Sequence, residues 1–332
     1  EIHERLVGSE MCIRDSYIQA MINYNRTFNT VHNVSGMFLY NQDQYNGNAP
    51  EDLIESLPQR KQGFAGRVTY AYDYRYMAEL NFGYNGSENF AKGNRFGFFP
   101  SGSIGYVISE EAFMKKQKVV DYLKLRASIG LVGNDNISDN RFLYLSNSWL
   151  VDQLPSEKDY WNAYKNGYNF GFNNGNMIKG AIESRIGNPN VSWETALKQN
   201  YGIDVNFLNN RLKVSADIFF EDRKDILIKR QTIPITTNLT SDNLPVVNMG
   251  RVKNHGYEID LKWEDVIKGK LHYYINANVS YNRNKIIFQD EVEPNEPYQW
   301  RTGQPVGTIF GYVADGFYND SDFELSLIHI SE

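Results

Sequence analysis

The sequence YMAELNFGYN, residues 76–85, is the clearest guide to the fold, because its alternate side chains belong to two different sets. One set is Tyr, Ala, Leu, Phe and Tyr, and the other is Met, Glu, Asn, Gly and Asn. Successive side chains of a strand point to opposite sides of the pleat, so this period of two predicts a strand with two different faces. In a soluble sandwich the apolar face meets a second sheet, whereas in an outer-membrane barrel it meets lipid and the polar face lines the lumen.

The composition of the 332 residues excludes several classes of protein. The chain is 41% hydrophobic with a mean hydropathy of -0.53, and it has no apolar run of about 18 residues, which excludes membrane-spanning helices. Aromatic residues make up 14%, which suits strands and membrane interfaces. The net charge of -6, with no basic stripe, argues against nucleic acid as a partner.

The same alternation recurs along the chain and predicts ten antiparallel strands. Most are close to the length of about 9–11 residues that a tilted strand needs to cross a bilayer. Consecutive strands form hairpins, as the opposed apolar sets of 195–207 and 211–221 indicate. The ten predicted strands are 17–28, 34–42, 63–72, 76–85, 101–109, 122–132, 195–207, 211–221, 255–263 and 271–282.

The alternation along each strand predicts one of two environments, lipid or lumen, for each residue. Lys124 and Arg126 are the informative cations, because an exposed cation at mid-depth in lipid would cost about 2–4 kcal/mol, and they are therefore expected to line the lumen. The residues predicted to face lipid are Tyr76, Leu80, Phe82, Leu125, Ile129, Ile203, Val205, Val214, Ile218, Ile259, Ile275 and Val279. The residues predicted to line the lumen are Glu79, Asn81, Arg126, Asp204, Asp217 and Glu258.

The connections favour the barrel over the sandwich. Links within hairpins are predicted to be short, and links between hairpins long, whereas a sandwich has two equally wet ends. Outer-membrane barrels have short periplasmic turns and long extracellular loops. Ten strands with an open edge would leave backbone groups unpaired in lipid, so the sheet is expected to be incomplete. The predicted long connections are 43–62, 86–100, 133–194, 222–254 and 283 onward.

Several phrases between and within the strands resemble a known family. They are GNRFGFFPSGSIGYVISEEAFMK (93–115), LKLRASIGLVGNDNI (123–137), GNPNVSWETA (187–196), NHGYEIDLKW (254–263) and GQPVGTIFGY (303–312). Together, and in order, they resemble the barrel half of SusC/RagA-like TonB-linked outer-membrane proteins, nutrient importers of Bacteroidetes. The resemblance implies a barrel of about 22 strands around an N-terminal plug. It also implies import of oligosaccharides or peptides energised by TonB, with a SusD-like surface lipoprotein as a lid.

The two ends differ from the rest of the chain. Residues 1–16, which hold the single cysteine Cys12, and residues 325–332 lack the alternation and resemble translated adapter sequence. We expect both to be foreign tails, with a partial receptor barrel over 17–324. The TonB box, the plug and the final strands of the family are not found in this sequence.

Candidate sites for small ligands are few. No catalytic motif is present, so neither enzymatic activity nor a cofactor is predicted. Asp135, Asn136 and Asp139 could offer oxygen ligands to Ca²⁺, but an Asx-rich turn explains them as well. An aromatic and amide-rich stretch predicts contact with a sugar ligand or a partner protein, although packing within the loop remains an alternative. Its candidate residues are Trp149, Tyr160, Trp161, Tyr164 and Tyr168.

Two other functions remain open from the residues alone. A soluble, secreted carbohydrate-binding β-sandwich would bury the apolar faces between two sheets. A passive porin or adhesin barrel would share the strands but need neither plug nor TonB.

Overall fold

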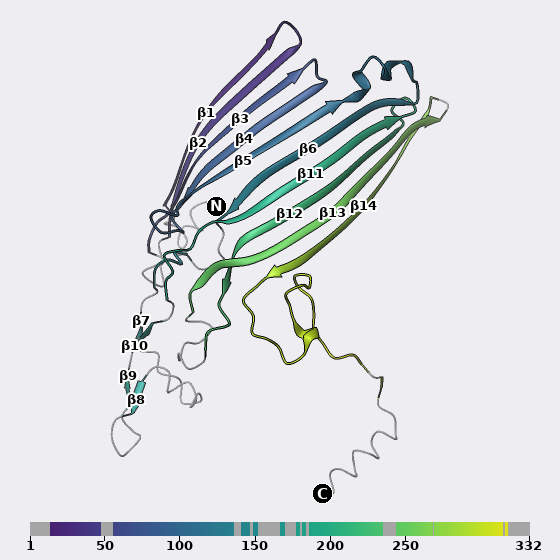
Figure 1. Cartoon of the computed structure of the whole chain (residues 1–332). Helices are drawn as coiled ribbons and strands as arrows, with labels where there is room; N and C mark the ends of the chain where they lie inside the picture. Colours follow the sequence, from purple (N-terminus) through teal and green to yellow (C-terminus); the bar gives the residue numbers. More distant parts are fainter. Residues whose placement is uncertain are drawn as a thin grey trace, which may run out of the picture.

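Ten long strands form one antiparallel sheet in the computed structural model (Figure 1). The structure describes residues 14–47, 56–135, 141–146, 149–151, 167–169, 177–179, 181–183, 186–234, 244–267, 269–314 and 316–317. The strands are β1 (Arg14–Phe28), β2 (His32–Asn46), β3 (Gln59–Tyr72), β4 (Tyr76–Ser87), β5 (Phe96–Val107), β6 (Val120–Asn134), β11 (Glu194–Phe207), β12 (Leu212–Lys229), β13 (Val246–Ile267) and β14 (Leu271–Phe288). All ten predicted strands are therefore confirmed.

The topology is up-and-down, with each long strand next to the one that follows it. The sheet is an open wall, with β1 and β14 at its two edges (Figure 1). Four short strands interrupt the numbering between β6 and β11 and form two separate two-stranded sheets. They are β7 (Trp149–Val151), β8 (Gly167–Asn169), β9 (Met177–Lys179) and β10 (Ala181–Glu183).

Three of the tight turns at one end of the sheet use left-handed backbone conformations. Asn29, Asp73 and Asn209 have φ values of 46°, 49° and 59°. Asn and Asp tolerate this region because their side chains can hydrogen-bond to nearby backbone. These turns set the hairpin registers, for example Phe207 opposite Leu212.

The β5–β6 connection, at the same end, is not a tight turn. Residues 108–119 hold two short 3₁₀ turns, η1 (Ile108–Glu110) and η2 (Met114–Lys116). This connection is longer than the one over residues 88–95, which lies at the opposite end. The prediction that short and long connections are strictly separated by end is therefore wrong at the β5–β6 hairpin, while the other connections follow it.

Every predicted long connection contains some strand, and two of them differ most from the prediction. β5 begins at Phe96, inside the predicted connection 86–100, and β12 and β13 extend far into the predicted connection 222–254. The register of β12 shifts between Arg223 and Ile226, where Asp225 has a φ of 58°, and this bulge breaks the alternation that strand prediction relies on. β13 reaches 22 residues, well beyond the about 9–11 that span a bilayer.

Buried residues gather at the end with the long connections. Phe90, Leu143 and Val191 form a small core there, with exposures of 0%, 3% and 0%. The faces of the sheet itself carry no second layer within the described residues. Among those residues, no helix has the length and hydropathy needed to cross a membrane.

The first strand begins close to the predicted boundary of the foreign tail. Residues 14–16 continue β1 and pair with residues 44–46 of β2. Residues 1–13 and 318–332 lie outside the described part of the chain, so the foreign origin of both tails stays a prediction.

Candidate functional site: the polar face of the sheet

The register of the sheet separates the two predicted environments onto opposite faces. Residues paired across neighbouring strands share a face, so a row such as Tyr106, Leu125, Ile203 and Ala216 can be followed from strand to strand. All twelve residues predicted to meet lipid fall on one face, called here the apolar face. All six residues predicted to line the lumen fall on the other, called here the polar face.

The apolar face is exposed along its length. Leu80 is 68% exposed, Ile218 53% and Ile275 61%. A soluble sandwich would bury these side chains against a second sheet, and the described residues provide none. The sandwich alternative is therefore contradicted by this structure.

The polar face carries an ionic cluster at its middle. The Arg126 guanidinium lies 2.9 Å from Asp204, Nε to Oδ2, and its Nη2 donates to Asp217 Oδ2 at 2.9 Å. Ser215 Oγ donates to Asp204 Oδ1 at 2.7 Å. Three of the predicted lumen residues thus meet in one network contributed by β6, β11 and β12, and two carboxylates on one cation leave it with a net negative charge.

Gly202 leaves room for the Arg126 side chain to extend across β11. Gly202 lies between Arg126 and Asp217 in the same cross-strand row. A Cβ at Gly202 would stand 2.5 Å from Asp217 Oδ1 and 2.9 Å from Arg126 Cζ, so a larger residue would displace the ion pair. On the other side of Arg126 the paired residue is Gly105 of β5, which also has no side chain.

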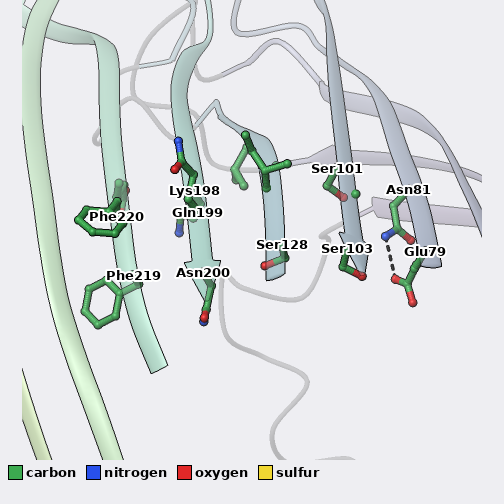
Figure 2. Close-up of a pocket in the computed structure, with 15 residues that line it drawn as sticks. Glu79, Asn81, Ser101, Ser103, Ser128, Lys198, Gln199, Asn200, Phe219 and Phe220 are labelled. Carbon is green, nitrogen blue, oxygen red and sulfur yellow. Dashed lines mark hydrogen bonds between the residues drawn. The ribbon is translucent and has the colours of Figure 1, made fainter. Parts of the chain in front are cut away.

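Beside this cluster the polar face forms a shallow recess of about 520 Å³ (Figure 2). Two rows cross it. One runs from Glu79 through Ser103, Ser128 and Asn200 to Phe219, and the other from Asn81 through Ser101, Gly130 and Lys198 to Glu221. Short serine side chains and the bare backbone of Gly130 form the floor, and longer amide and charged groups form the rims.

One rim of the recess is held in place by hydrogen bonds. Asn81 Nδ2 donates to Glu79 Oε1 at 2.7 Å, a contact visible in Figure 2, and Arg67 Nε donates to Asn81 Oδ1 at 2.9 Å. Glu79 also lies 3.5 Å from Arg67. The recess thus offers fixed acceptors and hydroxyl donors, which suit polar ligands or a polar protein surface.

The structure shows a second ordered region that sequence reasoning missed. At the end with the long connections, Trp193 packs on Phe90 and Phe99 with ring centroids 5.3 and 5.2 Å apart. Trp193 Nε1 donates to the Arg95 carbonyl at 3.1 Å. Asn248 and Ser192 exchange two hydrogen bonds of 2.9 Å. The phrases at 93–115 and 187–196 therefore meet in space. We call the contact region formed by Phe90, Arg95, Phe99, Ser192, Trp193 and Asn248 the clamp. The Asn and Trp residues of the two phrases were the signal that could have predicted it.

The phrase at 303–312 also has a structural role. After β14 the chain folds back, and Ile286 exchanges backbone hydrogen bonds with Gln304 and Gly303 at 2.9 and 2.8 Å. The backbone N–H of Val306 donates to Asn284 Oδ1 at 2.6 Å. These contacts cover part of the outer edge of β14, which would otherwise expose unpaired backbone groups.

The predicted aromatic stretch is only partly described. Trp149 begins β7, which pairs with β10, and Tyr168 lies in β8, which pairs with β9. Tyr160, Trp161 and Tyr164 lie outside the described residues, so the predicted contact role of this stretch stays untested.

The predicted Ca²⁺ ligands receive no support as a group. Asp135 forms an ion pair of 2.7 Å with Lys61, and Asn136 and Asp139 lie outside the described residues. Within the described ranges, no cluster of three or more His, Cys, Asp or Glu could hold a metal ion.

Comparison with known proteins gives a consistent result. The family model described as TonB dependent receptor-like, beta-barrel matches residues 7–323. The chain is 28% identical over 322 residues to TonB-dependent receptor P39 of Formosa agariphila, covering 89% of this chain and 28% of that protein. It is 29% identical over 247 residues to TonB-dependent receptor SusC of Bacteroides thetaiotaomicron, covering 74% and 23% respectively.

A solved structure supports the fold. The RagAB peptide importer in its closed-closed state superposes with a TM-score of 0.67 at 21% identity, covering 88% of this chain and 33% of that chain. The chain spans about a quarter to a third of the length of these relatives. Its match to the family model extends over the whole of the ten-stranded sheet, so the chain belongs to the TonB-dependent receptor-like β-barrel family, whose barrels are integral to the outer membrane.

Proposed function

We propose that this chain forms part of the barrel wall of a TonB-dependent importer, with its apolar face toward lipid and its polar face toward the lumen. The observation that supports this orientation best is the exposure of the apolar face beside a polar face that carries Arg126 with Asp204 and Asp217. Charged residues are tolerated in the wet interior and penalised in hydrocarbon.

The polar face would meet a plug and the cargo that passes it. The serine floor of the recess offers hydroxyls at Ser101, Ser103 and Ser128 without bulk, so a moving surface can approach the wall closely. Arg126 would keep its two carboxylates paired rather than reaching across the lumen. The proposed role of this wall is passage, without covalent chemistry on the cargo.

The cargo is proposed to be an oligosaccharide or a peptide, taken up with a SusD-like surface lipoprotein and energised by TonB. The similarity to SusC supports this class, as does the fold shared with a protein described as a peptide importer. The aromatic stretch around Trp161 and Tyr164 would contact cargo or lipoprotein outside the membrane.

That contact can be tested in the full-length protein. We expect Trp161→Ala with Tyr164→Ala to weaken binding of the cargo or of the lipoprotein. Isothermal titration with each partner separately distinguishes the two roles, and unchanged affinity for both would end the assignment.

The orientation of the wall can be tested by a matched pair of neighbouring residues. Ser128 and Ile129 are both exposed and lie on opposite faces of β6. We expect Ser128→Trp in the full-length protein to reduce uptake of its oligosaccharide or peptide cargo several-fold by narrowing the lumen. Ile129→Trp would place an aromatic ring among lipids, so uptake should match the wild type. Equal uptake by the two variants, at equal amounts in the membrane, would contradict the proposal.

A further inference from the structure

The apolar face has a hollow of about 780 Å³ over β5, β6, β11 and β12. Its lining is almost entirely apolar and includes Ile104, Leu125, Tyr201, Ile203 and Ile218. This hollow lies outside the polar face and takes no part in the proposed passage of cargo.

Two alanines create the hollow. One cross-strand row reads Ile104, Ala127, Tyr201 and Ile218, and the next reads Tyr106, Leu125, Ile203 and Ala216. In each row one small residue stands among large ones, and the two alanines lie on β6 and β12, on either side of β11. The result is a groove on a face that would otherwise be evenly covered by large side chains.

The groove ends beside the β5–β6 connection. Tyr76 and Tyr106 stack there with centroids 5.0 Å apart, and the Tyr76 hydroxyl donates to Glu111 Oε1 at 2.7 Å. Arg75 Nη1 lies 3.7 Å from Glu111 Oε2. Tyr76 belongs to the apolar face, so these contacts hold Glu111, and with it the connection, at the lipid side of the rim. Tyrosines at this position are typical of a membrane interface.

The same connection carries unpaired positive charge. Lys115 pairs with Glu110 at 3.4 Å, and Glu111 is occupied by Arg75, whereas no carboxylate of the described residues pairs with Lys116 or Lys118. Both lysines are exposed, as is Phe113 at 66%. An exposed aromatic ring beside unpaired lysines, next to an apolar groove, matches a molecule with a hydrocarbon tail and an anionic head.

The geometry points to a phospholipid site on this barrel wall. One acyl chain lies in the groove over Ala127 and Ala216, and the phosphate is bound by Lys116 and Lys118 at the rim. The tight turns of this family of barrels lie on the periplasmic side, so the lipid belongs to the inner leaflet. Surrounding lipid is as apolar as the groove, so tail selectivity comes from close packing and headgroup selectivity from charge-assisted hydrogen bonds.

The test uses the full-length protein in detergent and native mass spectrometry with dioleoyl phosphatidylglycerol, with dioleoylglycerol as the probe that lacks phosphate. We expect Lys116→Gln with Lys118→Gln to weaken phosphatidylglycerol binding several-fold and to leave dioleoylglycerol binding unchanged. Filling the groove with Ala127→Leu and Ala216→Leu should weaken binding of both lipids.

Two controls match these changes. Lys92→Gln removes an exposed lysine at the opposite end of the sheet, and Val68→Leu adds bulk to the apolar face outside the groove. Both should bind the two lipids as the wild type does. Phosphatidylglycerol affinity that is the same in the lysine variant as in wild type would overturn the headgroup site. The lysine variant alone decides this if the groove variant fails to assemble, because its changes lie in an exposed connection.

Discussion

Arg126 on β6 reaches over β11 to Asp217 on β12, with 2.9 Å between Nη2 and Oδ2. The residue beneath this ion pair is Gly202, whose missing side chain leaves the room. Three strands are thereby joined on the polar face by one side chain, in addition to the backbone hydrogen bonds of the sheet. An ion pair inside a barrel wall therefore depends on a residue that carries no charge.

Gly202→Ala should break this arrangement. The added Cβ would force apart Arg126 and Asp217, at a cost of about 1–3 kcal/mol in unfolding free energy. Urea unfolding of the full-length protein in detergent, followed by tryptophan fluorescence, measures the change. The control is Gly102→Ala on the apolar face, where a Cβ would meet Leu80 Cδ2 at 3.3 Å and the flexible side chain can give way. Equal stability of the two variants would show that the Arg126 path does not need Gly202.

Trp193→Phe and Trp193→Ala should separate two contributions to the clamp at the long-connection end. Phenylalanine keeps an aromatic ring against Phe90, with some loss of packing, and loses the hydrogen bond to Arg95, which contributes about 1 kcal/mol. Alanine also leaves a void, and since Trp193 is half-buried the loss should fall at the lower end of about 3–5 kcal/mol. Hydrogen exchange of the amides at 88–95 reports both changes. Unaltered protection in the alanine variant would show that Trp193 does not stabilise residues 88–95.

Asp290 should hold the chain after β14 to the β12–β13 connection over a wide pH range. Its side chain is 9% exposed, and this burial opposes ionisation, but hydrogen bonds from Gln231 and Thr232 outweigh it and hold the pKa of Asp290 below its usual range. A lowered pKa in the folded state means that the contribution is complete above the ordinary carboxyl value of 3.8 and is lost as the pH falls through the lowered value.

Amide exchange of Gln231 and Thr232 in the full-length protein checks this pH dependence. Protection, corrected for intrinsic exchange, should be constant from neutral pH down to about 4 and decrease below it. Asp290→Asn should lower the protection at neutral pH and abolish its acid dependence. A decrease in the wild type centred near pH 6 would point to a histidine rather than to Asp290.

Much of the fold could be predicted from the period of two. The apolar sets of the hairpin 195–207 with 211–221 were predicted on one face, and the structure pairs Val205 with Val214 and Ile203 with Ala216 on that face. The start of β5 was missed because Phe96, Phe98 and Phe99 form an apolar run without alternation. Phe99 lies on the polar face against Trp193, a contact with a residue 94 positions away that no local pattern reveals.

The sequence predicts which face of the sheet carries the residues of the candidate site, but it does not predict which of these residues contact one another. Alternation placed Arg126, Asp204 and Asp217 on one face, while their meeting depends on the stagger of three strands and on Gly202 between them. The recess was not predicted, because serines at positions 101, 103 and 128 look ordinary in the sequence and form a floor only when β5 and β6 pair.

Outer-membrane assembly of Leu80→Arg and Asn81→Arg in the full-length protein tests which face of the sheet meets lipid, since these neighbours lie on opposite faces of β4. An arginine at position 80 would meet lipid, at a cost of about 2–4 kcal/mol near mid-depth, whereas at position 81 it would meet the wet lumen. Heat-modifiable gel mobility of the membrane fraction measures assembly. We predict that Leu80→Arg fails to assemble and Asn81→Arg assembles as the wild type does. Equal assembly of the two variants, or failure of Asn81→Arg alone, would contradict the assignment of the two faces.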